Sequence, residues 1–168
     1  MTARSPKLRQ PCAVGLAMID PVEIAPVRSL PAGLETLRLE AARQGFGFLD
    51  RLVADWTSGA NTFGRPGEAL LGAFSDSRLV GIGGLNTDPY SSRADLGRIR
   101  HVYVLDAWRH KGVGRALIDC LVVKARGLFT ELRLRTDTEA AAAFYARCGF
   151  SPIADPTASH AFKLAGRI

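Results

Sequence analysis

Apolar residues recur along this chain at two spacings, one typical of helices and the other of strands. Leu34, Leu37 and Ala41 share one face of a helical pattern. Leu132 and Leu134 alternate with arginines, as in a strand with one face in water. The patterns predict helices over residues 30–44, 48–58, 112–125 and 139–148. They predict strands over residues 22–27, 69–74, 78–85, 98–105, 131–136, 150–153 and 159–164.

The order of these elements predicts the fold class. Pro26 restricts the first strand to an edge of the sheet, because proline cannot donate to a strand ladder. The runs 69–74 and 78–85 flank a short polar turn and predict an antiparallel hairpin, whereas the strand–helix–strand unit over 98–136 predicts a parallel pair. We therefore expect an α/β (α+β mixed) fold: a mixed, mainly antiparallel central sheet of 6–7 strands with helices on both faces.

Length and composition limit the class of protein. The 168 residues, 47% hydrophobic and 23% charged, are typical of one ordinary globular domain. The short apolar run 12–19 is too short for a membrane helix, and the Asp20-Pro21 after it is a poor signal-peptide cleavage site. We expect a flexible leader over 1–20, a single domain over 21–168, a cytoplasmic location and no membrane contact.

Cysteine, histidine and charge narrow the candidate chemistry. The three cysteines and three histidines are scattered without the spacing of a disulfide framework or a metal site, so we expect no metal. The net charge of +6 and the absence of long charged blocks indicate an anionic partner without choosing one. A cofactor with several phosphates would satisfy the charge, and a nucleic acid such as tRNA is a weaker alternative.

Residues 109–115 carry the most specific chemistry. The sequence Arg109-His110-Lys111-Gly112-Val113-Gly114-Arg115 follows an apolar strand directly and opens a helix. Such a turn places unpaired backbone N–H groups together at the positive end of a helix dipole, where phosphates bind. The two glycines allow close backbone approach, and the three basic side chains add positive charge. The turn predicts a diphosphate site, although the same glycines also fit a plain tight turn.

A second segment, Phe144-Tyr145-Ala146-Arg147-Cys148-Gly149-Phe150, ends the last helix. Together with the loop 109–114 and the order of elements, this segment makes the chain resemble the GNAT superfamily of N-acetyltransferases. These enzymes transfer the acetyl group of acetyl-CoA to an amine. The family loop has the form Arg/Gln-x-x-Gly-x-Gly/Ala, and the family helix ends in aromatic-Tyr-x-x-x-Gly-Phe. The resemblance covers about residues 22–164 in element order and about 98–150 in sequence.

The resemblance implies a set of site residues. Tyr145 would be the general acid that protonates the leaving thiolate of CoA. Thr138 stands where the family often has an asparagine that reaches the pantetheine arm, but a helix N-cap role fits threonine better. The backbone of the strand would pair with pantetheine and the turn would bind the pyrophosphate. These cofactor-binding residues are Val102, Tyr103, Val104, Arg109, His110, Lys111, Gly112, Val113, Gly114 and Arg115.

The general base and the amine acceptor are not assigned by the sequence. Candidates for the base are Glu68, Asp88, Asp95 and His101, each of which also fits a structural or solvated role, and a water chain serves equally well. Aromatic residues that would line the acceptor site are Phe46, Phe48, Trp56, Phe63 and Tyr90, the first three of which fit core positions equally well.

We therefore expect a cytoplasmic, acetyl-CoA-dependent N-acetyltransferase that acts on a primary amine of a small molecule, peptide or protein. One alternative is a non-catalytic acyl-CoA-binding regulatory module, and another is a transferase that acts on aminoacyl-tRNA. Related proteins are often dimers, so the resemblance also allows a homodimer.

Overall fold

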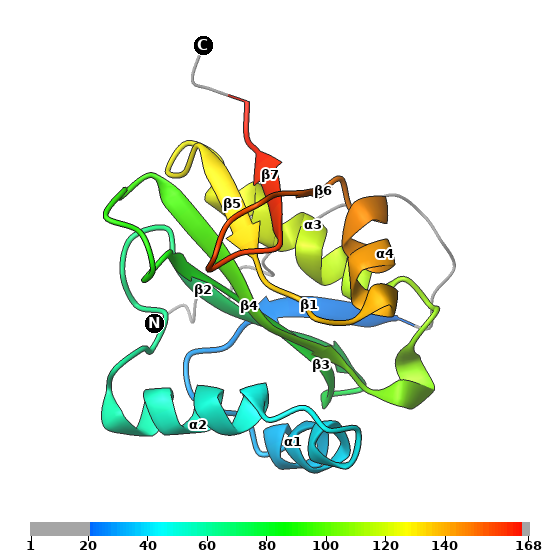
Figure 1. The fold of residues 1–168 in the computed structure, drawn as a ribbon. Helices are drawn as coiled ribbons and strands as arrows, with labels where there is room; N and C mark the ends of the chain where they lie inside the picture. The colour runs from blue at the N-terminus through cyan, green and yellow to red at the C-terminus, as the bar shows by residue number, and fades with distance from the viewer. Residues whose placement is uncertain (1–20, 166–168) are drawn as a thin grey trace, which may run out of the picture.

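The computed structural model describes residues 21–165 and is built on one seven-stranded sheet (Figure 1). The strand order is β1-β2-β3-β4-β5-β7-β6. The strands are β1 (Val22–Pro26), β2 (Ala69–Ser75), β3 (Arg78–Thr87), β4 (Leu96–Val104), β5 (Glu131–Leu134), β6 (Ser151–Pro152) and β7 (His160–Lys163). The helices are α1 (Leu34–Arg43), α2 (Phe48–Ser58), the 3-10 turn η1 (Asp106–Trp108), α3 (Val113–Ala125) and α4 (Glu139–Arg147).

This architecture confirms the expected fold class. All strand pairs are antiparallel except β4 with β5, which α3 connects. β1, with Pro26 at its end, forms one edge of the sheet as predicted. α1 begins at Leu34 rather than at residue 30, because Pro31 and Gly33 precede it and Gly33 lies against Leu79 of β3. Sequence periodicity did not predict η1, which has only three residues.

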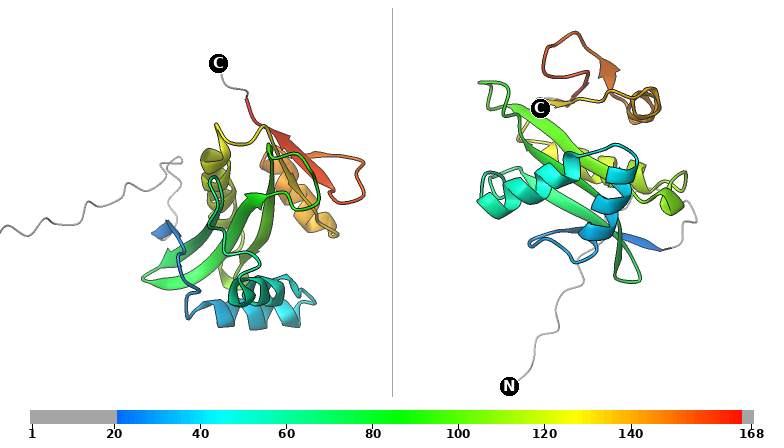
Figure 2. Two further views of the ribbon diagram at one scale, coloured as in Figure 1. Left: turned by 90° about the vertical axis from the view of Figure 1, so that its left-hand side faces the viewer. Right: turned by 60° about the horizontal axis from the view of Figure 1, so that its bottom comes forward.

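Helices cover both faces of the sheet (Figure 2). α3 packs on β2, β3 and β4 from one side, which we call the α3 face, and its Leu117 and Leu121 are fully buried. α1 and α2 contact β3 and β4 from the opposite side, the α1–α2 face, through the fully buried Leu37, Leu49 and Leu52. The core therefore lies in two layers, one on each side of β3 and β4.

The parallel pair β4–β5 opens into a fork. β4 pairs with β5 only over Leu96–Arg98, opposite Glu131–Arg133, yet β4 continues to Val104. We call the unpaired edge of residues 99–104, together with the facing segment 135–138, the fork. The register between β3 and β4 shifts at the same place, where His101 has a positive φ of 58°. The extra residue of such a bulge bends the strand, so β4 turns away where the pairing with β5 ends.

Candidate functional site

The free edge of β4 presents backbone groups to the fork. Leu105 donates its N–H to the Val80 carbonyl at 2.9 Å, on the β3 side of the strand. Since successive residues of a strand direct their backbone groups to alternate sides, the N–H and C=O groups of Val102 and Val104 are directed into the fork. An extended ligand can pair there as a missing strand would.

The N-terminus of α3 lies just beyond this edge. Gly112 is its N-cap residue with a φ of 84°, and no side chain of the described residues caps the helix there. His110 also has a positive φ, of 60°. The first N–H groups of α3 are therefore available for an anion, and glycine at 112 makes the required left-handed conformation inexpensive.

Arg109 makes contacts with β4 and α1, and its expected role in binding the cofactor stays a prediction. Its Nε donates to the Val104 carbonyl at 3.1 Å, and its Nη2 donates to Gln44 Oε1 at 2.9 Å. The guanidinium also lies 5.2 Å from the centre of the Tyr103 ring and 3.3 Å from a carboxylate oxygen of Asp106. Arg109 thus ties the turn to β4 and α1, which the local sequence could not reveal.

The other two basic residues of the turn remain near the surface. Lys111 is exposed, with its Nζ 5.2 Å from the centre of the Trp108 ring. Arg115 donates to the carbonyl of Arg147 at 2.9 Å and lies 3.4 Å from Asp119, so it joins the first turn of α3 to the end of α4.

Gly114 allows α3 and α4 to approach each other. A Cβ at position 114 would lie 3.1 Å from Cζ of Phe144, tighter than an ordinary van der Waals contact. The sequence favoured a close approach between this glycine and a ligand. In the structure the Phe144 ring lies against Gly114, and the approach of a ligand to this glycine stays a prediction.

Thr138 caps α4. Its hydroxyl oxygen accepts a hydrogen bond from the Ala141 N–H at 3.2 Å, which confirms the N-cap interpretation. The same helix carries Tyr145 at its buried face.

Tyr145 is 9% exposed and packs edge-on against Phe144 and Phe150, with ring centres 5.0 and 5.8 Å away. Burial raises the pKa of the Tyr145 phenol well above its usual value, so the group is neutral at pH 7. Within residues 21–165 its hydroxyl makes no hydrogen bond, and it is therefore an unused donor.

Tyr103 contributes only its backbone to the fork. Its side chain is buried on the α1–α2 face and donates a 2.8 Å hydrogen bond to Glu40 Oε1. Burial, with the hydrogen bond to Glu40, raises the pKa of Tyr103 to about 12. Glu40 also accepts the Asp106 N–H at 2.7 Å, so it holds η1 on α1, and the sequence carried no signal for that role.

The three candidate carboxylates for the general base are all engaged in local contacts. Glu68 accepts the Thr87 N–H at 2.9 Å, and Asp95 forms an ion pair with Arg93 at 2.8 Å. Asp88 is buried beside Arg98 at 3.5 Å.

His101 is 7% exposed, and burial, reinforced by the nearby Arg100, lowers the pKa of its imidazole to about 4. His101 is therefore neutral at pH 7.

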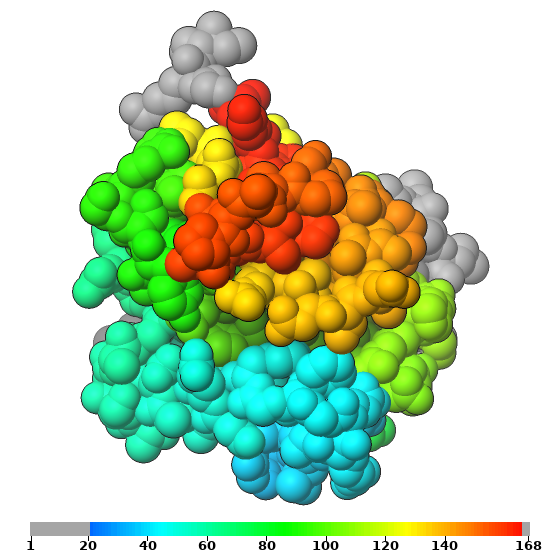
Figure 3. Space-filling view, viewed as in Figure 1, coloured from blue at the N-terminus to red at the C-terminus, as the bar shows by residue number. Residues whose placement is uncertain are grey.

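The expected acceptor aromatics lie on the α1–α2 side of the molecule. Phe63 is buried against His101, and Tyr90 is 52% exposed with the Arg98 guanidinium 4.6 Å from its ring centre. Phe46, Phe48 and Trp56 are partly buried against the core. Figure 3 shows a seam between α1–α2 and the segment from residue 135 to β6, and β4 is visible within it.

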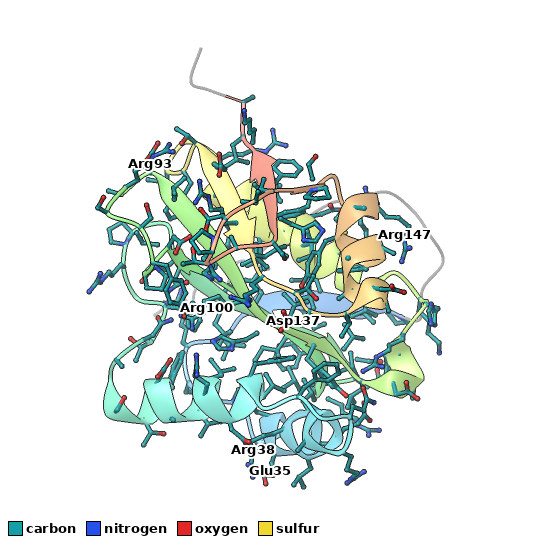
Figure 4. The ribbon with its side chains drawn as sticks, in the orientation of Figure 1. Glu35, Arg38, Arg93, Arg100, Asp137 and Arg147 are labelled. Carbon is teal, nitrogen blue, oxygen red and sulfur yellow. The ribbon has the colours of Figure 1, made fainter. Side chains whose placement is uncertain are left out.

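Sequence analysis missed the charged face of β4 beside this seam. Arg98 and Arg100 are two residues apart and lie on the same face of the strand, opposite Asn86 and Gly84 of β3. Figure 4 labels Arg100. The available signal was a pair of arginines at strand spacing within an otherwise buried strand.

Residues 21–165 contain no group of three or more histidine, cysteine, aspartate or glutamate side chains that could hold a metal ion. None of the helices described in this range has the length and apolar character needed to cross a bilayer. The leader expected over residues 1–20 lies outside the described residues.

Comparison with known proteins places this chain in one protein family. A family model described as an acetyltransferase (GNAT) domain matches residues 66–152. Among curated proteins, none matches this sequence significantly.

Solved structures are similar over most of the chain. A protein from Exiguobacterium sp. 255-15, assigned as an acetyltransferase, is 28% identical with a TM-score of 0.76, covering 85% of this chain and 93% of its own. A protein from Desulfovibrio desulfuricans, assigned to the GNAT family, is 19% identical with a TM-score of 0.65, covering 86% and 100%. The yncA protein of Salmonella typhimurium, solved with its cofactor acetyl-CoA, is 14% identical with a TM-score of 0.62, covering 87% and 95%.

Proposed function

Because this chain belongs to the GNAT family of acetyltransferases, we propose that it transfers the acetyl group of acetyl-CoA to a primary amine by direct attack in a ternary complex. The amine would belong to a small molecule, a peptide or a protein. The Salmonella typhimurium neighbour, which carries acetyl-CoA, supports this choice of donor.

The observation that carries the proposal is the fork and its continuation into α3. The N–H and C=O of Val102 and the N–H of Val104 would bind the pantetheine arm as a neighbouring strand, since the Val104 carbonyl already accepts from Arg109. The free N–H groups after Gly112 would bind the pyrophosphate. A strand edge followed by a helix N-terminus matches an extended arm that ends in a diphosphate, as the pantetheine arm of CoA does.

Chemistry at the fork would follow from position and protonation. A neutral amine held beside the thioester attacks the carbonyl carbon, and the C–S bond of the tetrahedral intermediate then breaks. Backbone N–H groups of the bulge would stabilise the oxyanion. Tyr145, neutral and without a described hydrogen bond, would donate its proton to the leaving thiolate, while the amine would release its surplus proton to water. The Tyr145 phenolate would regain a proton from water, so the raised pKa of the phenol restores the neutral acid for the next turnover.

Binding at the turn is tested by thermal unfolding with excess acetyl-CoA. Ligand at a hundred times its Kd stabilises the folded chain by about 2.7 kcal/mol, which raises the Tm by roughly 2–4 °C for a protein of this size. We expect Gly112→Asp to abolish the shift, because it adds a side chain and a negative charge where the pyrophosphate binds.

Gly127→Asp is the matched control. Gly127 has a φ of 81°, close to the 84° of Gly112, so both variants carry a similar backbone cost, but Gly127 follows the opposite end of α3. A shift that is lost in both variants, or in neither, would contradict binding at the turn.

Tyr145→Phe tests the acid. The variant removes no described hydrogen bond, so the fold and the acetyl-CoA affinity should be unchanged while kcat falls about 10²–10⁴-fold. A kcat close to that of the wild type would exclude the acid role. Acetyl-CoA binding with no turnover of any amine by the wild-type protein would instead favour the non-catalytic acyl-CoA-binding module.

A further inference from the structure

Arg100 lies where β4 leaves β5. It is two residues beyond Arg98, the last residue of β4 that pairs with β5, and it precedes the bulge at His101. Its cross-strand partner is Gly84, and the Phe63 ring occupies the space that a Gly84 side chain would need. Figure 4 shows Arg100 near the centre of the molecule, between α2 and the segment that leads from β5 to α4.

The guanidinium of Arg100 has no partner among residues 21–165. The side chain is half-buried, but it makes neither a hydrogen bond nor an ion pair within that range. Guanidinium groups bind carboxylates and phosphates with paired, charge-assisted hydrogen bonds, so this group is ready for such a ligand.

The neighbouring arginines of β4 and β5 are all engaged. Arg98 donates to the Thr157 carbonyl at 2.6 Å, and Arg133 lies 2.7 Å from Glu131. Arg135 lies 3.7 Å from Asp137, which faces the same seam. Glu131 and Asp137 are thus paired with other arginines, and Arg100 has no carboxylate partner within residues 21–165.

Other polar groups on this side of the sheet also lack partners. Oδ1 of Asn86 and both ring nitrogens of His101 are buried and meet no hydrogen-bond partner of good geometry in the described part of the chain, although the backbone of Phe48 lies near the imidazole. The two residues are 6% and 7% exposed. These atoms are enclosed by the protein, so they make the interior beside Arg100 polar but do not themselves face a ligand.

The position of Arg100 separates it from the expected diphosphate. Arg100 lies four residue steps before the strand end at Val104, at most about 13 Å along a strand, and the turn at 109–115 lies beyond that end. The charge of Arg100 is therefore placed for a group on the acceptor and not for the pyrophosphate.

We propose that the amine acceptor carries a carboxylate or phosphate group, and that Arg100 binds this group at the place where β4 and β5 diverge. The proposal rests on the acetyltransferase function proposed above. It makes Arg100 a specificity-determining residue for anionic amines.

The test uses matched pairs of amines that differ in the anionic group. β-Alanine against β-alaninamide and Ala-Asp-Ala against Ala-Asn-Ala report on a carboxylate, and phosphoethanolamine against ethanolamine reports on a phosphate. We expect the wild-type protein to prefer one anionic member, and Arg100→Gln to lower kcat/KM for it by about 10- to 100-fold while the neutral partner changes little. Arg126→Gln, an exposed arginine beyond the end of α3, is the matched control and should change neither.

A second measurement does not depend on turnover. Calorimetric titration of the same amines into the CoA-saturated protein should show tighter binding of the anionic member to the wild type than to Arg100→Gln. Equal affinity for anionic and neutral members, or a loss of CoA affinity in Arg100→Gln, overturns the proposal. Absence of any acetyl-CoA binding by the wild type would instead remove the acetyltransferase function itself.

Discussion

His101 combines two features that a histidine seldom has together. It adopts a left-handed backbone conformation at the bulge of β4, and its imidazole is buried against Phe63 with the ring centres 6.1 Å apart. An imidazole removed from water loses its charged form, and the charge of Arg100 acts in the same direction. The free energy of unfolding should therefore depend on pH through the His101 side chain.

The sign of that dependence follows from the two pKa values. The pKa of His101 is about 4 in the folded protein and about 6.5 in the unfolded chain, so between these values the unfolded chain binds the extra proton. The contribution is complete above pH 6.5 and is lost as the pH falls towards 4. We expect His101 to account for about 2 kcal/mol of the drop in unfolding free energy between pH 7 and pH 5.

Urea denaturation at the two pH values measures this contribution. His101→Asn removes the titration and keeps a residue type that tolerates positive φ, so the drop should shrink by about 2 kcal/mol relative to the wild type. His110→Asn has a similar backbone conformation, φ 60°, at an exposed position and should leave the drop unchanged. An equal drop in wild type and His101→Asn would show that the imidazole binds its proton as readily in the folded protein as in the unfolded chain.

At the scale of elements, the pair Arg98–Asp88 joins two connections that are far apart in the sequence. Asp88 follows β3 and accepts the Tyr90 N–H at 2.9 Å, while Arg98 reaches the Thr157 carbonyl in the connection from β6 to β7. The two side chains are 7% and 1% exposed. Together they hold the connection after β3 and the connection from β6 to β7 against β4.

Removing one member of this pair should be costly. Asp88→Asn keeps an oxygen for the Tyr90 N–H but leaves the buried Arg98 charge without its counter-ion, so we expect a loss of about 3 kcal/mol in unfolding free energy. The double variant Asp88→Asn with Arg98→Met should recover part of that loss, because it removes the uncompensated charge.

Asp95→Asn is the control for an exposed ion pair. Its partner is Arg93, and the two side chains are 42% and 53% exposed, so screening by solvent should make the effect much smaller. Urea denaturation at pH 7 compares the variants. A loss from Asp88→Asn no larger than that from Asp95→Asn would mean that the buried pair does not hold the two connections together.

At the scale of the whole molecule, local patterns predicted the helices and strands. Contacts between residues far apart in the sequence decided the direction and burial of individual side chains. The order of strands and helices, the edge position of Pro26 and the helix start after Gly112 all followed from periodicity and turn chemistry. The inward direction of Arg109 did not, because its partner Gln44 belongs to a distant helix. The burial of Asp88 likewise depends on Arg98 across the β3–β4 pair, which no local spacing reports.

The fork divides β4 into two halves that should respond differently to the cosubstrate. Gly97 and Arg98 are paired on both sides, by β3 and by β5, so their amides should exchange slowly with or without ligand. The N–H groups of Val102 and Val104 face the unpaired edge. Hydrogen exchange with saturating acetyl-CoA should therefore slow at Val102, Val104 and the first turn of α3, where the ligand would accept their hydrogen bonds. Gly112→Asp should abolish this local protection, and Gly127→Asp should keep it. Uniform slowing over the whole sheet would indicate only the general stabilisation that any ligand provides, and would contradict backbone pairing at the fork.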